Sequence, residues 1–552
     1  MPFRNLFSLR MLPLLTVGVS AIGLAAFSGG ALSGGPLVAF VILAALTALG
    51  LFDLLQREHS VLRNYPITAH LRFILEEVRP EIRQYFVEDD NSGYPFSRNK
   101  RSIVYQRAKR NLDKRPFGTQ LDVYSEGFEW MNQSLAPRAV NGHDFRTRIG
   151  GPACARPYDA SIFNISAMSF GALSANAILA LNAGAKRGAF AHNTGEGGFS
   201  PYHRANGGDI IWEIGSGYFG CRTQDGRFDP NQFAAIATLD QIRMIEIKLS
   251  QGAKPGHGGL LPGAKVSAEI AAIRGVEAGR DCVSPAAHAA FSTPVELLGF
   301  IDRLRTLSGG KPVGVKLCIG QPHEFFAICK AMVATGLLPD FITIDGKEGG
   351  TGSAPLEFMD HIGMPMRDAI ALAHHTLIGV DLRRHIRLAA SGKITTAFDI
   401  ARACALGADW CYSARGFMFA LGCIQSLKCH TDRCPTGVAT QDPARARALV
   451  PELKAERVFN YHQSTLAALA ELVAAAGVSH PLELRANDFR VRLSEKRISS
   501  FADLYPEPAT GAFLNGVVPE NYARDWLEAQ AESFRPASPC LQDRRPSTPQ
   551  GE

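Results

Sequence analysis

The sequence predicts an α/β protein built on a (β/α)8 TIM barrel, with an N-terminal transmembrane helical hairpin and a helical extension before the barrel. Beyond residue 150, short apolar or β-branched runs alternate with glycine-rich loops and Ala/Leu-rich stretches, as the strands, loops and helices of such a barrel do. Residues 11–52 contain no Asp, Glu, Lys, Arg or His, which indicates a membrane segment.

The composition narrows the class of protein further. The 552 residues are 46% hydrophobic and 20% charged, which excludes wholesale disorder. The net charge of +6 is small for this length and forms no basic stripe, so no nucleic acid is expected as a partner. Eleven cysteines, an odd number, argue for a reducing compartment and against a secreted disulfide framework.

The apolar segment is divided by a Gly/Ser/Pro cluster, residues 28–36, into two stretches near the lower length limit of a membrane-spanning helix. Arg4 and Arg10 precede the first stretch and Arg57 follows the second, while the turn between them is uncharged. By the positive-inside rule this predicts a hairpin in the inner (cytoplasmic) membrane, with the large remainder of the chain facing the cytoplasm. The alternatives are a cleaved signal peptide followed by a stop-transfer segment, and a buried hairpin of a soluble protein.

We expect four parts along the chain, each with its own composition. The hairpin is followed by a charged extension with helix-like patterning, then by the barrel, then by polar, Pro-containing sequence that ends in a disordered tail. Their bounds are 1–56, 57–150, 151–480 and 481–552. The eight barrel strands are expected at residues 162–169, 188–193, 243–249, 281–284, 313–317, 341–345, 386–391 and 409–413.

Three cysteines follow the last expected strand at C-x5-C-x4-C spacing: Cys423, Cys429 and Cys434. Thiolates at this spacing can converge on one metal centre, and three of them suit an iron–sulfur cluster that lacks one corner ligand. A zinc site would add His430 or Cys411 as a fourth ligand. The third alternative, buried cysteines without a metal, fits poorly with a polar loop.

Glycine-rich loops follow the last three expected strands, at Asp345–Gly352, Ser391–Lys393 and Ser413–Gly416. Glycines let backbone N–H groups approach phosphate oxygens, and loops after the seventh and eighth strands of such barrels frequently bind phosphate. The alternative is that these glycines only make tight turns. Lys316 lies in an apolar strand, where it is placed to neutralise an electron-rich flavin ring.

Two further loops, Asn193–Gly198 and Glu246–Gly259, combine glycines with charged side chains. Carboxylate, amide and amine groups on a glycine-rich backbone suit the binding of a small dicarboxylate and the transfer of protons, although a solvated loop has the same composition. Gly215–Gly220 matches the G-x-G-x-x-G pattern of dinucleotide binding, but the sequence after it is not helical, which argues against that fold.

These loops, in this order, resemble the flavin domain of glutamate synthases over about residues 150–480. The whole chain resembles the stand-alone, membrane-associated FMN-binding members of that family. The segment 53–118, with Pro95–Arg98, resembles the N-terminal region that this group shares. The matching barrel elements are Ala167–Gly171, Asn193–Gly198, Gln251–Gly256, Gly349–Gly352 and Cys423–Gln441.

The resemblance implies FMN in the barrel, a 3Fe–4S cluster on the three cysteines, and an oxidoreductase of class EC 1.4 that reductively aminates 2-oxoglutarate. Glu196, Lys248 and Lys254 would face the keto acid. The flavin-binding positions carried over from the family are Ser169, Gly171, Gln251, Lys316, Gly349, Gly350, Gly392, Ala414 and Arg415.

The chain also departs from the large glutamate synthases. Its first cysteine is Cys154, so we expect no N-terminal glutaminase nucleophile, and ammonia or another amine would supply the nitrogen. His257 stands where those enzymes usually have an acid. Electrons would come from a ferredoxin, a reductase subunit or a membrane quinone. The chain is also compatible with a homo-oligomer. Two alternative functions are an FMN enzyme for N-alkyl amino acids or hydroxy acids, and a membrane-tethered redox sensor without turnover.

Overall fold

The structure, a computed structural model, describes residues 11–27 and 33–537 and divides the chain into two units, Met1–Pro95 and Phe96–Glu552. The boundary falls inside the extension expected at 57–150. The disordered tail expected at the C-terminus falls almost entirely outside the described residues.

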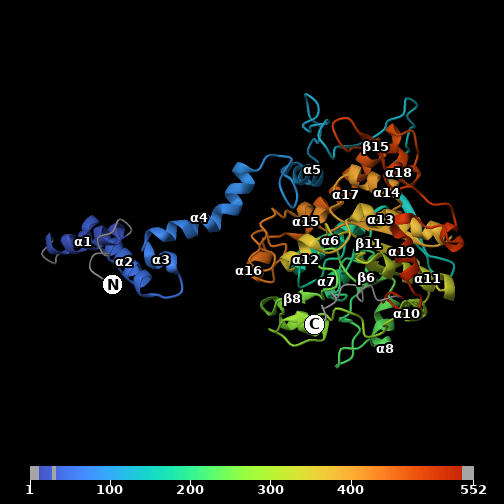
Figure 1. The fold of residues 1–552 in the computed structure, drawn as a ribbon. Coiled ribbons are helices and arrows are strands. Elements are labelled where there is room, and N and C mark those ends of the chain that lie inside the picture. The colour runs from blue at the N-terminus through green and yellow to red at the C-terminus, as the bar shows by residue number, and fades with distance from the viewer. Residues whose placement is uncertain (1–10, 28–32, 538–552) are drawn as a thin grey trace, which may run out of the picture. The chain divides into compact units, whose positions relative to one another are not determined.

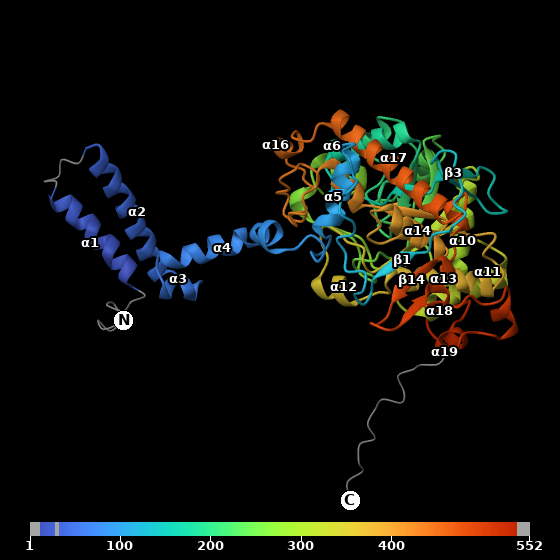
Figure 2. The same cartoon turned by 90° about the horizontal axis from the view of Figure 1, so that it is seen from above.

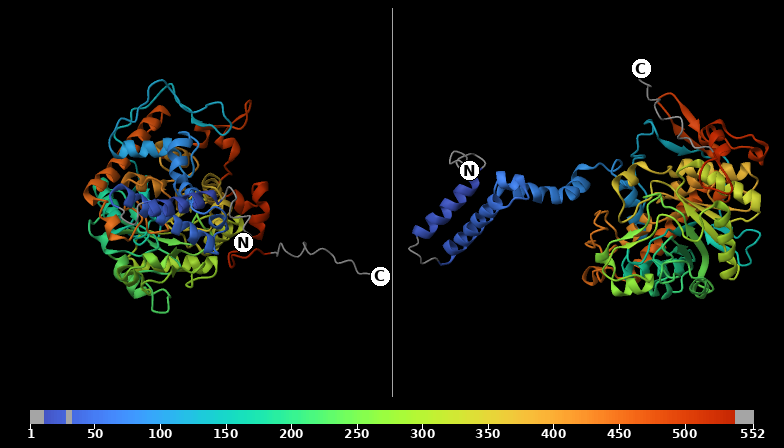
Figure 3. Two further views of the ribbon diagram at one scale, coloured as in Figure 1. Left: turned by 90° about the vertical axis from the view of Figure 1, so that its left-hand side faces the viewer. Right: turned by 60° about the horizontal axis from the view of Figure 1, so that its bottom comes forward.

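The N-terminal unit contains two apolar helices that pack side by side, α1 (Leu12–Phe27) and α2 (Gly35–Leu55) (Figure 3). They are followed by α3 (Ser60–Asn64) and α4 (Thr68–Ile82), which continues into a π-helical turn at Arg83–Val87. Among the described residues, α2 is the one helix long and apolar enough to cross a membrane by length and composition. Of the two spanning helices expected, α2 has the required length, whereas α1, with 16 residues, is shorter than a full span.

The second unit is built on a closed barrel of eight parallel strands, which confirms the predicted fold class (Figure 1). Each strand is short, and its residues are almost all buried because helices cover the outside and side chains fill the inside. In barrel order the strands are β4 (Phe163–Ile165), β5 (His192–Asn193), β6 (Ile210–Ile214), β7 (Ile242–Lys248), β10 (Val313–Leu317), β11 (Phe341–Asp345), β12 (Arg387–Ser391) and β13 (Trp410–Ser413).

One predicted strand was wrong. Residues 281–284 do not enter the barrel: Cys282–Val283 (β9) pairs antiparallel with Leu260–Leu261 (β8) in a separate two-stranded sheet. The eighth strand of the barrel is instead β6, which was not predicted. It lies between β5 and β7, and its five residues are all buried. β6 contains Glu213, and a charged residue in a five-residue run hides the apolar pattern of a buried strand.

Helices surround the barrel, and the long helix α17 packs on α6 and α5 (Figure 2). The C-terminal strands β14 (Phe489–Arg492) and β15 (Ile498–Ser500) form a small antiparallel sheet with β1 (Glu129–Met131), which precedes the barrel in the chain. A separate pair is formed by β2 (Arg146–Ile149) and β3 (Tyr158–Ser161). The helices are α5 (Arg98–Ala108), α6 (Ala175–Gly188), α7 (Pro201–Arg204), α8 (Pro230–Ala237), α9 (Ala268–Arg274), α10 (Pro294–Leu307), α11 (Pro322–Thr335), α12 (Leu356–His361), α13 (Met366–Gly379), α14 (Ala397–Ala405), α15 (Arg415–Leu421), α16 (Pro443–Ala446), α17 (Pro451–Ala475), α18 (Phe501–Leu504) and α19 (Glu520–Glu528).

Candidate functional site

A cavity opens at the carboxyl ends of the barrel strands, where loops after β4, β7, β11, β12 and β13 meet. Seven of the nine predicted flavin-binding residues line it: Gln251, Lys316, Gly349, Gly350, Gly392, Ala414 and Arg415. The cavity is also lined by polar residues that end three of the strands, Asp345, Ser391 and Ser413. This is the end of the barrel at which enzymes of this architecture bind their ligands.

Phe96 also lines the cavity, although it precedes the barrel and belongs to none of the barrel motifs. Its backbone N–H and carbonyl form two hydrogen bonds, both 3.2 Å, with the side-chain amide of Gln425. The ammonium of Lys393 lies 5.9 Å from the centre of the Phe96 ring. Residues far apart in sequence therefore close this side of the cavity, and the only sequence signal was the Pro95–Arg98 motif of the resemblance.

Glycines let the backbone come close to buried side chains around the cavity. A Cβ atom at Gly350 would overlap the guanidinium of Arg415, and one at Gly416 would overlap the hydroxyl groups of Tyr461 and Ser413. Gly392 has a φ of 150°. The glycines in these loops are thus required by packing and leave backbone groups exposed toward the cavity, which suits a phosphate.

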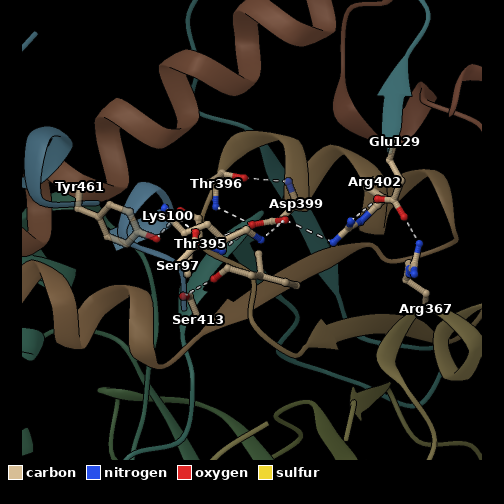
Figure 4. Close-up of polar contacts among 11 residues, drawn as sticks. Ser97, Lys100, Glu129, Arg367, Thr395, Thr396, Asp399, Arg402, Ser413 and Tyr461 are labelled. Atoms are coloured by element: carbon tan, nitrogen blue, oxygen red, sulfur yellow. Dashed lines mark hydrogen bonds and ion pairs between the residues drawn. The ribbon is translucent and has the colours of Figure 1, made fainter. Parts of the chain in front are cut away.

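The loop between β12 and α14 is held rigidly beside the cavity (Figure 4). The Asp399 carboxylate accepts hydrogen bonds from the backbone N–H groups of Thr395 and Thr396, both at 3.1 Å. Tyr461 donates its hydroxyl to the Thr395 carbonyl at 2.8 Å, and Ser413 donates to the Ile394 carbonyl at 2.5 Å. Side chains from three other elements therefore fix the position of this loop.

Charges support the same loop from behind. Lys100 and Arg402 each lie 3.3 Å from Asp399, and Glu129 forms ion pairs with Arg402 and Arg367 (Figure 4). Although burial alone would raise it, the pKa of Asp399 is lowered by Lys100 and Arg402. Asp399 therefore stays ionised and keeps its hydrogen bonds to the loop.

A buried polar cluster lies inside the barrel below the cavity. The Lys316 ammonium is 3.1 Å from the Glu213 carboxylate, and Glu246 accepts hydrogen bonds from Asn193 at 2.7 Å and Thr343 at 2.6 Å. Burial opposes the charge on Lys316, but Glu213 and the other nearby carboxylates raise its pKa well above the usual value. Lys316 thus presents a permanent positive charge at the floor of the cavity.

Glu246 should make stability depend on pH. Burial and the neighbouring Glu213 raise its pKa from 4.5 to about 7, despite Lys316. A carboxyl whose pKa is raised by folding stabilises the fold while protonated, so this contribution is present at low pH and is lost as the pH rises through about 7. We expect the free energy of unfolding to fall by about 3 kcal/mol between pH 5 and pH 8 from this group.

The measurement is thermal or urea unfolding of the detergent-solubilised protein across this pH range, with Glu246→Gln as the control. The substitution keeps the shape of the side chain but cannot titrate, so the difference between the two proteins isolates Glu246. An unchanged pH profile in Glu246→Gln would mean that Glu246 is ionised throughout.

A second charged group, at the ends of β5 and β7, contains the three residues predicted to face the keto acid. The Lys248 ammonium is 3.2 Å from the Glu196 carboxylate, and the Lys254 side chain is buried beside them. Burial opposes ionisation of Glu196, yet Lys248, Arg274 and Lys254 lower its pKa. Burial lowers the pKa of Lys254, which the Glu196 charge partly offsets.

The two groups are joined by one short segment of chain. Gln251 and Ala253 line the cavity, and Lys254 follows directly. Gly252 donates its N–H to Asp345 at 2.9 Å, and a Cβ at this position would overlap the Gly346 carbonyl. This close approach presses the segment against the end of β11 and sets the Glu196 group beside the cavity.

Ser169 and Gly171, predicted to bind the flavin, are not among the residues that line the cavity. The Arg274 guanidinium donates to the Ser169 hydroxyl at 3.2 Å and to the Phe170 carbonyl at 3.0 Å. Gly171 also lies against Arg274. Since Arg274 is one of the cations that act on Glu196, these two residues belong to the side of the site where Glu196 lies.

The three predicted metal ligands lie in the loop after α15. The thiols of Cys423, Cys429 and Cys434 are close enough to influence one another's charge, and Lys265 donates to the Cys429 carbonyl at 3.1 Å. No group of three or more His, Cys, Asp or Glu side chains is arranged to hold a metal ion in the part of the chain that the structure describes.

The zinc alternative gains no support from the two candidate fourth ligands. Cys411 is buried in strand β13, where its thiol contacts Cys404. His430 is exposed. A tetrahedral site needs four converging ligands, and these two side chains do not join the loop cysteines.

The fold is an α/β barrel with a cavity at the carboxyl ends of its strands, the end at which enzymes of this architecture bind their ligands. The conserved region of glutamate synthase matches residues 157–479, more than half of the chain. The chain belongs to the glutamate synthase family and is a glutamate synthase-like oxidoreductase. Membership of this family supports FMN as the cofactor.

Two curated relatives illustrate the similarity. The glutamate synthase large subunit-like protein YerD of Bacillus subtilis (strain 168) is 39% identical over 492 residues, which cover 81% of this chain and 93% of that protein. The archaeal glutamate synthase [NADPH] of Methanocaldococcus jannaschii is 36% identical over 375 residues, covering 67% of this chain and 69% of that protein.

The solved structures that align with this chain are much more distant in sequence. The recombinant flavin-binding domain of baker's yeast flavocytochrome b2 aligns with 10% identity and a TM-score of 0.41, over 74% of this chain and 85% of that chain. This likeness is too distant to indicate a shared ligand.

Proposed function

We propose that this protein uses FMN and an iron–sulfur cluster to reductively aminate 2-oxoglutarate or a related keto acid, with ammonia or another amine as the nitrogen source. The observation that carries the proposal is the junction of two sites: a glycine-lined cavity with a fixed cation, and the Glu196–Lys248–Lys254 group beside it. When bound, FMN would supply the hydride that reduces the carbon–nitrogen double bond.

The residues of the cavity fit FMN. Its loops expose backbone beside Gly350 and Gly392, Arg415 is available for the phosphate, and Lys316 is available for the electron-rich part of the ring. The fit to FMN therefore rests on two cations, Arg415 and Lys316, and on glycines at positions where a side chain would clash with its neighbours.

The charged group beside the cavity fits a dicarboxylate and an amine. Lys248 and Lys254 would hold carboxylates by ion pairs, and burial strengthens these interactions because water does not screen them. Glu196, held ionised by the surrounding cations, would hold the nitrogen and exchange its protons. The short segment Gln251–Lys254 would keep substrate and cofactor in a fixed relation.

The cysteine loop supplies the donor set of a 3Fe–4S cluster, and cluster binding would have to draw the three thiols together, since they are not arranged around a metal ion in the described structure. Three thiols within twelve residues are the ligands such a cluster needs, and Arg415 and Lys265 supply nearby positive charge for an anionic cluster. Arg415 also lines the cavity, so the same side chain contributes positive charge to the cavity and to the cysteine loop. A ferredoxin, a reductase subunit or a membrane quinone would exchange electrons with this side of the barrel.

We also propose that α2 anchors the protein in the inner membrane, with the barrel facing the cytoplasm. Only 11% of the most apolar 18-residue stretch of α2 is buried, whereas a core helix of a soluble protein would be mostly buried. The Arg residues on both sides of the apolar segment support this orientation.

The proposed cofactors are tested by an anaerobic absorption spectrum of the detergent-solubilised protein, followed by acid release. We expect flavin bands on a broad iron–sulfur background and free FMN in the supernatant. Cys429→Ser should remove the iron–sulfur background and slow electron transfer from the donor to the flavin. A colourless protein that contains zinc would contradict the proposal.

Gly259→Ala should lower activity without releasing FMN from the cavity. A Cβ at Gly259 would overlap the Glu196 carboxylate, which must then leave Lys248. We expect kcat/KM for the keto acid to fall by about 100-fold, the effect of misplacing a reacting group by about 1 Å. Gly320→Ala is the matched control because nothing lies within 4 Å of its Cβ position. Equal activity of the two variants would show that Glu196 has no fixed role.

A further inference from the structure

Helix α4 carries an apolar stripe that no other part of its unit covers. Apolar residues recur along it with the i, i+3, i+4, i+7, i+11 spacing of one helix face, and all are exposed. Phe73, on another face, lies against the His59 ring at 6.0 Å. The residues of the stripe are Leu71, Ile74, Leu75, Val78 and Ile82.

The start of α4 is fixed to the end of α2. The fully buried Asp53 carboxylate of α2 accepts hydrogen bonds from the Ile67 backbone N–H and the His70 ring, both at 3.0 Å. The Ile67 side chain lies against Gly50 of α2, where a Cβ would clash with it. The first turn of α4 is therefore held at the level of the last turns of α2, and α4 leaves the α1–α2 pair there (Figure 2).

Basic side chains are not in excess on α4: Thr68–Ile82 contains Arg72 and Arg79 but three glutamates, Glu76, Glu77 and Glu81. Arg72 pairs with Glu76 at 2.9 Å, and Arg83 in the following turn pairs with Glu88 at 2.6 Å. Since α4 has no excess of basic side chains, the feature of this helix that needs a partner is apolar. A partner that neutralises charge, such as a nucleic acid or a strongly acidic surface, is not favoured.

We propose that α4 lies in the plane of the lipid–water interface, with its apolar stripe inserted among the lipids. This inference rests on the proposed membrane insertion of α2. If α2 spans the bilayer, the Asp53 hydrogen bonds place the start of α4 where the hydrocarbon ends, and an amphipathic helix at that depth buries its stripe in lipid. Because basic side chains are not in excess on α4, its insertion does not require anionic lipid.

The experiment uses single tryptophan substitutions in the full chain, reconstituted into phosphatidylcholine vesicles with lipid brominated near the headgroup end of its acyl chains. Ile74→Trp reports the stripe, Glu77→Trp reports the polar face of the same helix, and Ile42→Trp reports α2. The native tryptophans all lie after residue 95, so the unsubstituted protein gives their contribution.

We expect the added emission of Ile74→Trp to be quenched about threefold more than that of Glu77→Trp, because an interfacial helix inserts only its apolar face. Quenching of Ile42→Trp without quenching of Ile74→Trp would overturn the inference on α4 and leave the membrane anchor intact. If neither is quenched, the proposed anchor itself fails. A blue-shifted but unquenched Ile74→Trp would show that protein covers the stripe, which also overturns the inference. Adding phosphatidylglycerol should leave the ratio unchanged.

Discussion

Lys316→Met is expected to lower the free energy of unfolding by about 3–5 kcal/mol, because it removes one partner of a buried ion pair. Glu213 would lose the ammonium 3.1 Å away while its side chain stays 2% exposed, and Glu246 and Asp345 would lose a neighbouring positive charge. The loss should grow with pH as Glu246 ionises. Urea unfolding of the detergent-solubilised protein measures the stability, and acid release measures the retained FMN, which should also fall.

A double-mutant cycle with Glu213→Gln supplies the control. Each single substitution leaves a lone buried charge or an unmatched partner, so the double variant should lose less stability than the sum of the two single variants. Additive losses, or a loss below about 1 kcal/mol for Lys316→Met, would mean that water reaches this cluster and screens it.

Lys248→Met is expected to lower kcat/KM for the keto acid by about 100- to 1000-fold, while the protein still folds and retains FMN. The substitution removes a fixed cation from a buried site, and such preorganised charges account for losses of this size. It also leaves Glu196 without its nearest partner at 3.2 Å. Steady-state kinetics with varied keto acid, together with the flavin spectrum, separates this effect from loss of cofactor.

Ser284→Ala is the matched control, because the Ser284 hydroxyl donates to the same Glu196 carboxylate but over 3.4 Å. A long neutral hydrogen bond contributes little, so its effect should be much smaller. If Lys248→Met is as active as Ser284→Ala, then Lys248 does not hold the substrate. If Lys248→Met instead loses activity only with an N-alkyl amino acid or a hydroxy acid, the alternative enzyme for those substrates is favoured.

The sequence allowed the barrel and much of its cavity to be predicted, since these depend on local patterns. Short buried strands followed by glycine loops are visible in a single sequence, and Lys316 is the last residue but one of β10 while Arg415 follows β13 by two residues. β6 was missed because its buried Glu213 is explained only by a lysine on another strand, about a hundred residues further on.

Long-range packing accounts for the rest. Phe96 reaches the cavity through hydrogen bonds to Gln425, and no local pattern could pair residues so far apart. Ser169 and Gly171 follow β4, as expected of ligand-binding residues, but the Arg274 side chain from α9 draws them toward Glu196. The two-span hairpin was predicted from an absence of charge, while helix length depends on where the helix begins and ends.

The most direct test of the proposed function is a single-turnover experiment without oxygen. The flavin of the solubilised protein is reduced chemically, excess reductant is removed, and 2-oxoglutarate and ammonium are added separately and together. We predict that the visible absorption band of oxidised flavin returns only when both are present, with formation of an equivalent amount of glutamate. Two results would contradict reductive amination of 2-oxoglutarate. One is reoxidation of the flavin by the keto acid alone with formation of a hydroxy acid, and the other is no reoxidation even when both substrates are present.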